Sequence, residues 1–535
     1  MSKKPFQFAV DIPAGLVVFL VALPLCLGIS LASGAPFFSG LIAGIIGGVV
    51  IGTMSNSNLS VSGPAAGLAA LVFAAIANIG DFRLFLCAVV IAGMLQIAMS
   101  LARLGGIANY FPSSVIKGML TSIGILIIAK QIPHATGHDK EEKGQLTEIF
   151  SIGDEDWHDL LKPLQHIDLG VLLICVISIL IMVFWERPAI KKKVKFIPGA
   201  LIAVFVSVVL NELFKITNNP LTITDEHLVK LQIAQSPTEF FSFFTLPDFS
   251  GFFNSKVIIT GFMIALIASL ETLLCIEAID NLDPERNTTN TNRELLAQGI
   301  GNSISGLIGG LPITSVIVRS SANLHAGAKT KLSSITHGLL LFVCVVTIPK
   351  ILNLIPLAAL AAILLITGYK LCKFSVFNQM WKNGKYQFAP FIVTVAVIIG
   401  VDLLGLYKPL KGEGLLIGVF AGLVTAAVSI LLGNLKNSYY FHKDQHHEGD
   451  RITIKLSEEV SFLNKASIRV TLDHLPENTN VTIDASGSKY IDFDVLEIIK
   501  EFRDIKAPLK NISCKLFGFK EAYNIENTSH VLSTH

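Results

Sequence analysis

Apolar segments separated by short polar stretches occupy most of the chain, and their lengths are those of membrane-crossing helices. No Asp, Glu, Lys or Arg occurs between Ile12 and Gly80, a run of 69 residues. A helix needs about 20 apolar residues to cross the hydrocarbon core of a bilayer, so this run alone can hold about three crossings. The pattern therefore predicts an α-helical polytopic membrane protein.

About fourteen candidate spans are predicted, seven on each side of the polar stretch Lys215–Lys256. They are Ile12–Leu31, Phe37–Met54, Ser60–Ile79, Leu84–Leu101, Val115–Ala129, Leu169–Trp185, Ile197–Leu213, Val257–Ile279, Leu295–Leu311, Thr314–Ala326, Leu332–Ile348, Ile351–Tyr369, Phe388–Val401 and Gly414–Leu432. The two sets define repeats at about 12–214 and 256–433, inside a membrane domain at 1–435.

The charge pattern changes near residue 450, where the chain becomes as charged as an ordinary soluble domain. Strand-like alternation at Arg451–Leu456 and Val481–Asp484 is followed by a helical pattern at Val495–Phe502. We therefore expect a small α/β domain at 450–535, joined to the membrane domain by a linker at 436–449.

Composition agrees with a membrane protein and excludes several other classes. Of the 535 residues 52% are hydrophobic and only 15% are charged, with a mean hydropathy of +0.62, whereas a soluble domain carries about 25% charged residues. A net charge of +2 gives no affinity for nucleic acid. The seven cysteines lack metal-site spacing, and His442, His446 and His447 fit a solvated tail better than a metal site. No nucleophile–base pair, phosphate-binding loop or zinc motif occurs. The sequence therefore predicts no enzyme activity, no transport driven by ATP hydrolysis and no cofactor.

Loop charges predict the orientation of the chain. If Lys3 and Lys4 are cytoplasmic, the even-numbered loops are cytoplasmic as well, and these loops carry most of the basic residues, namely Arg187, Lys191, Lys192, Lys193, Lys195, Lys329, Lys331, Lys370, Lys373, Lys382 and Lys385. The long fifth loop, His134–His166, mixes acids with few bases. This pattern obeys the positive-inside rule and predicts cytoplasmic N- and C-termini in a multi-pass protein of the cell's inner (plasma) membrane.

Two of the candidate spans are short and begin at Gly/Pro breaks. Ser60–Ile79 opens with Ser-Val-Ser-Gly-Pro-Ala-Ala-Gly, and Thr314–Ala326 follows Gly-Gly-Leu-Pro. Each is the third span of its half, and interrupted segments at corresponding positions indicate a transporter binding site. Helix N-termini at the midplane offer unpaired N–H groups and a positive dipole end, which suit an anion. The alternative is a pair of kinks that serve packing alone.

Glu271 follows fourteen uncharged residues in Val257–Ile279, about 20 Å of helix. A carboxylate inside the bilayer is costly and usually functional, and it can exchange a proton or bind Na⁺. The alternative is a span that starts later, with Glu271 near the cytoplasmic surface beside Glu277 and Asp280.

Arg319 lies one or two turns into the short tenth span. Its guanidinium can provide a fixed positive charge for an anion, pair with Glu271, or snorkel to an interface. Lys117, Lys130 and Asp402 fall near predicted span ends and are expected at the membrane surface.

Several motifs in order resemble the SulP family of anion transporters over essentially the whole chain. They are Ala14-Gly15-Leu16, Leu23-Pro24, Gly63-Pro64-Ala65-Ala66, Glu271-Thr272-Leu273-Leu274, Asn292-Arg293-Glu294 through Asn302, Gly309-Gly310-Leu311-Pro312, Arg319-Ser320-Ser321-Ala322-Asn323 and Gly327-Ala328-Lys329-Thr330. The resemblance implies a seven-plus-seven inverted repeat with UraA-like core and gate subdomains and an elevator-like movement, and we expect a homodimer.

In the SulP family the anion site lies between the facing N-termini of the third and tenth spans. On this chain the substrate-binding positions are Ser62, Gly63, Pro64, Ala65, Ala66, Thr314, Ser315, Val316, Ile317, Val318 and, as a basic position seen in some members, Arg319. Glu271 matches the acidic cation-coupling position of the eighth span. Sodium-coupled bicarbonate members have Asp there and Thr one turn later, where this chain has Cys275. The lost hydroxyl argues against Na⁺ and favours H⁺ as the coupling ion.

The C-terminal part resembles a STAS domain. The phosphorylatable Asp-Ser-Ser/Thr pattern of related regulatory domains is replaced by Asp492-Phe493-Asp494, so phosphorylation is not expected there. Asp494 is either a phosphate mimic or a plain surface acid. A cytoplasmic partner of this domain is a further expectation.

These features predict a secondary transporter of a small inorganic anion, with bicarbonate favoured over sulfate or a small dicarboxylate. An uncoupled anion channel or exchanger is the second reading, and a membrane-anchored signalling scaffold acting through the STAS domain is the third. A nucleobase symporter shares the fold but lacks the STAS domain.

Overall fold

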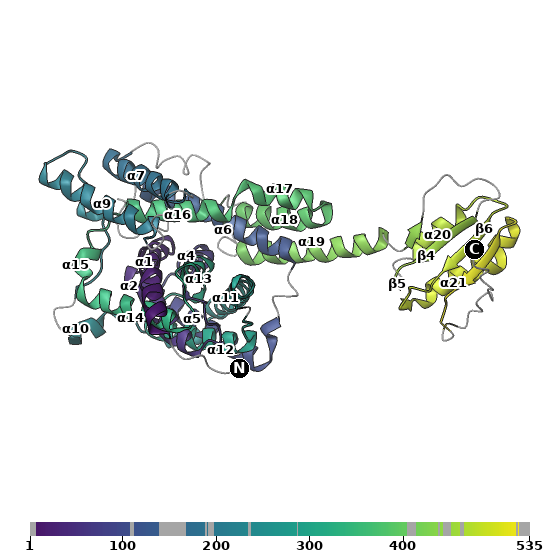
Figure 1. Cartoon of the computed structure of the whole chain (residues 1–535), viewed down its shortest axis with the longest axis horizontal. Coiled ribbons are helices and arrows are strands. Elements are labelled where there is room, and N and C mark those ends of the chain that lie inside the picture. The colour runs from purple at the N-terminus through teal and green to yellow at the C-terminus, as the bar shows by residue number, and fades with distance from the viewer. Residues whose placement is uncertain are drawn as a thin grey trace. The chain divides into compact units, whose positions relative to one another are not determined.

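The computed structural model describes residues 7–106, 112–137, 167–187, 190, 197–233, 237–285, 287–403, 414–436, 439–441, 451–460, 465–520 and 523. The chain divides into two compact units. One comprises Met1–Lys382 and Pro390–Leu423, and the other comprises Asn383–Ala389 and Val424–His535. Figure 1 shows the helical membrane unit and the small α/β unit, which are described separately here.

Each predicted span coincides with helix in the described part of the chain. In the first half these elements are α1 (Phe8–Ala32), α2 (Phe37–Ile46) continued by the π-helical η1 (Gly47–Ile51) and α3 (Gly52–Met54), α4 (Ala66–Ile79), α5 (Phe82–Leu101), α6 (Ser113–Thr136), α7 (Leu169–Trp185) and α9 (Gly199–Ile216). In the second half they are α11 (Ser255–Leu282), α12 (Thr291–Leu307), α13 (Ile317–His325), α14 (Leu332–Thr347), α16 (Leu357–Leu371) with α17 (Phe374–Lys382), α18 (Lys385–Asp402) and α19 (Gly414–Lys436). Short elements η4 (Asp225–His227), α10 (Pro237–Ser242), η5 (Phe249–Phe253) and α15 (Pro349–Leu352) lie between them.

Eight of the described helices are long and apolar enough to cross a bilayer, and four shorter apolar helices accompany them. α4 and α14 are among the shorter ones. The chain is a multi-pass membrane protein.

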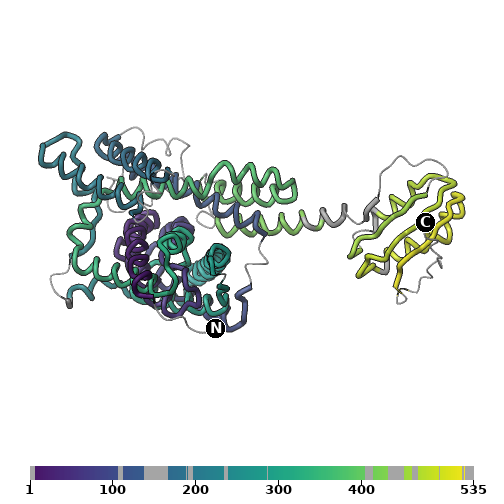
Figure 2. Tube along the Cα trace, in the orientation of Figure 1, coloured from purple at the N-terminus to yellow at the C-terminus, as the bar shows by residue number. Residues whose placement is uncertain are grey.

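Helices far apart in the sequence pack closely through glycine. A β-carbon on Gly48 would lie 2.6 Å from the Cα of Gly338 in α14, and one on Gly299 in α12 would lie 2.8 Å from the carbonyl oxygen of Gly93 in α5. Small residues let membrane helices approach this closely. Figure 2 shows the result: the purple trace of α1 and α2 lies among the teal helices of the second half, and both α1 and α2 contact α14.

The first helix begins four residues earlier than the apolar run predicts, at Phe8 instead of Ile12. Asp11 therefore lies in its first turn, fully buried. It accepts hydrogen bonds from the backbone N–H groups of Lys329 (2.8 Å) and Thr330 (3.0 Å) and from the Thr330 hydroxyl (2.5 Å). The carboxylate thus joins the start of α1 to the loop between α13 and α14.

The C-terminal unit is a small α/β fold, as its sequence pattern predicts. β3 (Tyr439–Phe441) pairs antiparallel with β4 (Arg451–Leu456), and β6 (Asn480–Asp484) and β8 (Ser513–Phe517) continue the sheet in parallel, in the order β3-β4-β6-β8. A separate two-stranded sheet joins β5 (Glu459–Val460) to β7 (Tyr490–Ile491). The remaining elements are α20 (Lys465–Asp473), α21 (Phe493–Glu501), η8 (Phe502–Lys506) and α22 (Ala507–Leu509).

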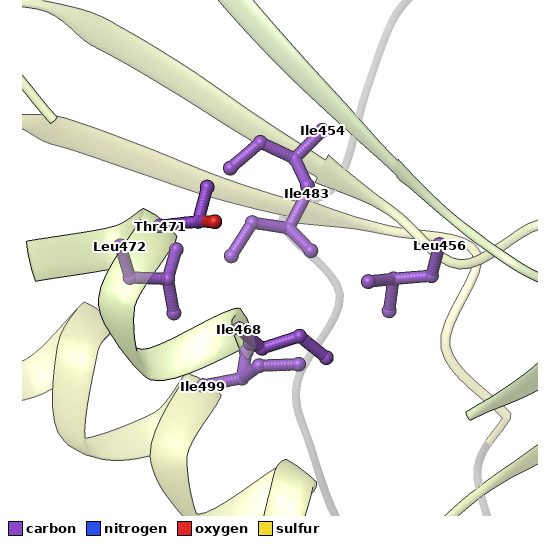
Figure 3. A pocket seen from close by; sticks show the side chains of 7 residues that line it. All are labelled: Ile454, Leu456, Ile468, Thr471, Leu472, Ile483 and Ile499. Carbon is purple, nitrogen blue, oxygen red and sulfur yellow. The ribbon is translucent and has the colours of Figure 1, made fainter. Parts of the chain in front are cut away.

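The core of this unit contains one small gap, shown in Figure 3 between the strands and the helices α20 and α21. Its volume is about 10 Å³, and its lining is Ile454, Leu456, Ile468, Thr471, Leu472, Ile483 and Ile499. A volume of this size holds at most one water molecule, so the gap is a feature of core packing. The Asp494 side chain, like His442, His446 and His447, lies outside the described residues.

Candidate functional site

The two interrupted spans meet in a short β-ribbon. β1 (Ser62–Pro64) precedes α4, β2 (Ile313–Ser315) precedes α13, and the two strands pair antiparallel with Ser62 opposite Ser315. Every residue of both strands is buried. The sequence predicts the two breaks, whereas the pairing between them is a finding of the structure.

The helices that leave this ribbon have uncapped N-termini. Ala65 at the start of α4 and Val316 at the start of α13 carry no side chain that can accept a hydrogen bond from the first turn. The first N–H groups of a helix have no partner within the helix, and they form the positive end of its dipole. Because the strands run antiparallel, these two positive ends lie at opposite ends of one ribbon.

The residues predicted to bind substrate do not all contribute in the same way. Ser62, Gly63, Pro64, Ala65, Thr314 and Ser315 are buried around the ribbon. The side chains of Ile317 and Val318 are 49% and 52% exposed, so these two residues can offer only backbone N–H groups to a buried anion. Ala66 is half-buried at the first position of α4.

Arg319 reaches from the first turn of α13 back across the ribbon to β1. Its side chain is fully buried, so it does not snorkel to an interface. Nη2 donates to the Pro64 carbonyl at 3.3 Å and to the Cys26 sulfur at 3.5 Å. Nη1 lies over Gly63, where a β-carbon would stand only 2.0 Å away. Nη1 and Nε have no hydrogen-bond partner in the described part of the chain, so this cation retains donors for a ligand.

Glu271 lies against the start of α4. It lies in the interior of α11, sixteen residues after Ser255. A β-carbon on Gly67 would lie 2.6 Å from Glu271 Oε1. Glu271 Oε2 is buried and has no hydrogen-bond partner among the described residues. No ion pair joins Glu271 to Arg319 in this part of the chain, which leaves both charges available to other ions.

The residues that follow Glu271 along α11 hold β2. The Thr272 hydroxyl accepts the N–H of Ser315 at 3.1 Å. The Ser315 hydroxyl donates to the Cys275 sulfur at 3.2 Å, and it is also hydrogen-bonded to the Ser60 hydroxyl. Cys275 thus contacts the ribbon through Ser315. Figure 1 draws α1, α4, α11 and α13 beside one another, and α11 contacts both α4 and α13.

Two features of this region were not identified from the sequence. Glu294, Gln298 and Asn302 form a fully buried polar face of α12 that contacts the ribbon. Their spacing of four residues, which places them on one face of a helix, is the signal that could have revealed them. The second is Lys130, expected at a membrane surface, whose ammonium lies 3.7 Å from the centre of the Phe73 ring on α4. No cluster of three or more His, Cys, Asp or Glu side chains suited to a metal occurs within the described ranges.

A family model identifies the chain. The model of the sulfate permease family matches residues 8–394, which include the ribbon, α11, α12 and α13. The chain belongs to the sulfate permease family. It is therefore a membrane transporter of anions and not an enzyme.

The relatives of this chain are named for two different substrates, sulfate and bicarbonate. The chain is 26% identical over 446 residues to the putative sulfate transporter YvdB of Bacillus subtilis, covering 82% of this chain and 77% of that protein. It is also 26% identical over 399 residues to the bicarbonate transporter BicA of Picosynechococcus, covering 72% of this chain and 66% of that protein.

A solved structure supports the same fold over nearly the full length. The murine Solute Carrier 26 family member A9 anion transporter, in its inward-facing state, superposes with a TM-score of 0.70 at 14% identity. The match covers 98% of this chain and 87% of that one. The small strand-containing C-terminal region of this chain fits a STAS domain.

Proposed function

We propose that this member of the sulfate permease family is a secondary active transporter of a small inorganic anion, with bicarbonate as the favoured substrate. The observation that carries the proposal is the placement of Arg319, which lies fully buried against a ribbon from which two uncapped helix N-termini start. Helix N-termini and an arginine with unused donors form a binding site for an anion. The anion would lie between the starts of α4 and α13, near Ser62 and Ser315.

The formal charges near the ribbon favour a monovalent anion. Arg319 is the one Lys or Arg among the fully buried side chains of the described residues, and Glu271 and the fully buried Glu294 are the acids near it. A monovalent anion would balance Arg319 and a coupling cation would balance Glu271, while Glu294 shares Ser55 as a hydrogen-bond partner with the ammonium of Lys331. A buried, unbalanced charge is costly, so bicarbonate fits this arithmetic better than sulfate does. Sulfate remains the second candidate because two helix dipole ends together equal about one further positive charge.

The carboxyl of Glu271 supports cation coupling, with H⁺ favoured over Na⁺. Glu271 Oε2 is buried without a partner among the described residues, and a proton on it removes a charge that the membrane interior disfavours. A sodium ion needs several oxygen ligands. The sulfur of Cys275 is a poor substitute for a hydroxyl oxygen as a ligand of Na⁺.

The proposal also includes an elevator-like transport movement and a homodimeric state. It places the protein in the plasma (inner) membrane with cytoplasmic N- and C-termini. The two interrupted elements, α4 and α13, occupy corresponding places in the two halves, which supports a repeat-based mechanism. The basic residues Lys329, Lys331, Lys370, Lys373 and Lys382 follow the positive-inside pattern. The dimer rests on the family resemblance.

Uptake into proteoliposomes tests the proposal and separates it from the two alternatives. Labelled bicarbonate uptake, corrected with protein-free vesicles for CO₂ leakage, is competed with unlabelled sulfate under an imposed pH or Na⁺ gradient. Coupled transport requires uptake that depends on one gradient. An uncoupled channel or exchanger requires flux without that dependence. A signalling scaffold would show no anion flux. It would bind a protein partner, and deletion of residues 450–535 would abolish that binding.

A further inference from the structure

One face of α12 holds the ribbon through buried polar side chains. Glu294, Gln298 and Asn302 are each fully buried and spaced one helical turn apart. Asn302 accepts the N–H of Ile313 at 2.6 Å and donates to its carbonyl at 3.0 Å, which fixes the backbone of β2. Gln298 makes the contact to a side chain of β1, that of Ser62.

The two hydrogen-bond partners of Gln298 Nε2 orient the amide, whose Oε1 is buried and has no partner among the described residues. Its Nε2 donates to Ser62 Oγ at 2.8 Å and to Glu294 Oε1 at 3.0 Å. When Glu294 is ionised, its oxygens accept hydrogen bonds and cannot donate them, so a reversed amide would place Gln298 Oε1 against another acceptor. The Ser55 hydroxyl donates to the second oxygen of Glu294 and holds the carboxylate in place. Glu294 therefore determines that the NH₂ end of Gln298 faces Ser62.

This orientation decides what the Ser62 hydroxyl can do. A serine hydroxyl has one O–H donor and two acceptor lone pairs. Gln298 occupies an acceptor position, and within the described ranges the Ser62 O–H donates to no residue. Ser62 is only 3% exposed and lies beside Gly63, over which the Arg319 guanidinium is placed. A buried donor without a partner costs free energy, and it calls for an acceptor at this place.

We propose that Gln298, oriented by Glu294, fixes the Ser62 hydroxyl as a hydrogen-bond donor to the transported anion. Gln298 and Glu294 are then positioning residues, and Ser62 is a direct ligand of an oxyanion such as bicarbonate or sulfate. The inference rests on the proposed function, because it requires an anion at the ribbon. In this proposal α12 does more than hold the shape of the site. It also determines that the Ser62 hydroxyl acts there as a donor.

Binding to the purified full-length protein tests this inference, with bicarbonate and sulfate as the titrated probes. We expect Ser62→Ala to raise Kd about tenfold, the loss of one hydrogen bond to a charged group. Gln298→Glu should raise Kd at least as much, because a carboxylate at 298 would accept the Ser62 O–H and withdraw it from the anion. Gln298→Met should raise Kd less, because it frees the hydroxyl without introducing an acceptor.

The double variant Ser62→Ala/Gln298→Glu distinguishes positioning from structural damage. If Gln298 acts through Ser62, the double variant binds like Ser62→Ala alone. Gln131→Glu, which places a carboxylate at another buried glutamine on α6, is the matched control and should bind like the wild type. Effects of the two single changes that multiply, or a Gln298→Glu protein that binds like the wild type, would overturn the inference. If Gln298→Glu does not fold, the double variant Ser62→Ala/Gln298→Met is compared with Ser62→Ala instead. Equal Kd values for these two proteins would support the inference, and multiplied effects would overturn it. A wild-type protein that binds neither anion would overturn the proposed function, and the inference with it.

Discussion

The carboxyl of Glu271 on α11 lies directly against Gly67, the second residue of α4. This contact joins the acid expected to bind the coupling cation to the helix whose N-terminus is expected to bind the anion. Any movement of α4 that accompanies anion binding would change the surroundings of Glu271. The relationship therefore supplies a physical route by which the anion and the cation affect each other's binding.

Gly67→Ala should impair coupled uptake strongly while leaving the protein folded. The added β-carbon would lie 2.6 Å from Glu271 Oε1, so either the carboxyl or α4 must shift. We expect a loss of at least tenfold in gradient-driven uptake, because small displacements of reacting or binding groups are costly in a preorganised site. Gly487→Ala is the control, since nothing lies within 4 Å of a β-carbon at that position. Uptake by Gly67→Ala at the wild-type rate would contradict the functional reading of this contact.

Arg319→Gln should weaken anion binding more than Arg319→Lys does. Glutamine removes the positive charge, whereas lysine keeps it but lacks the planar fork that reaches both Pro64 and the space over Gly63. We expect Kd for bicarbonate to rise more than tenfold with glutamine and by a smaller factor with lysine. Arg469→Gln, a change of an exposed arginine in the C-terminal unit, is the matched control. Equal binding by wild type and Arg319→Gln would remove Arg319 from the site.

Asp11→Asn should destabilise the membrane unit without a specific effect on substrate choice. The amide offers one acceptor oxygen where the carboxylate oxygens accept from Lys329 N–H, Thr330 N–H and the Thr330 hydroxyl. The expected loss is about 1–3 kcal/mol in the free energy of unfolding, measured as a lower melting temperature in detergent. Asp225→Asn, at an exposed position, should leave the melting temperature unchanged. A wild-type melting temperature for Asp11→Asn would show that the contact is not stabilising.

The C-terminal unit should show a small acid-dependent loss of stability at Asp473. The hydrogen bond from Lys506, 2.8 Å away, lowers the pKa of Asp473 below its usual value. A carboxyl with a lowered pKa in the folded state stabilises the fold above its unfolded pKa, and this contribution is lost as the pH falls through the folded value. Because both side chains are partly exposed, the effect is well under 1 kcal/mol.

Hydrogen exchange of residues 465–520 in the full-length protein measures the Asp473 effect. Asp473→Asn, which leaves the pair between Lys506 and Glu501 in place, should raise the exchange rates slightly at pH 6 and have no effect at a pH below the pKa of Asp473. A difference that grows on acidification would show that the pair does not act as described.

The sequence predicts most of the membrane fold because span length and the two Gly/Pro breaks are local properties. The breaks before Ala66 and Ile317 follow from Gly63-Pro64 and from Gly309 through Pro312. The pairing of β1 with β2 could not be predicted from those breaks, because it depends on how segments about 250 residues apart pack against each other. Correct placement of the breaks located the ribbon, but not its register.

Charged and polar residues inside the spans were harder to place. The position of Glu271 in the middle of α11 could be predicted from the apolar run around it, and Arg319 proved to be buried instead of interfacial. Gln298 carries no charge, so the charges inside the spans do not single it out. Its importance depends on which face of α12 meets β1, and this is decided by packing between the helices. Lys130 was expected at a surface because the predicted span ended at Ala129, whereas α6 continues to Thr136.

The pH dependence of labelled bicarbonate uptake by wild type and Glu271→Gln tests the central claim most directly. Glutamine keeps the size of the side chain, but its amide neither releases nor binds a proton near neutral pH. We expect wild-type uptake in proteoliposomes to follow an imposed proton gradient, and Glu271→Gln to lose gradient-driven uptake while it still binds bicarbonate. Uptake by Glu271→Gln that follows the same gradient as the wild type would contradict the account.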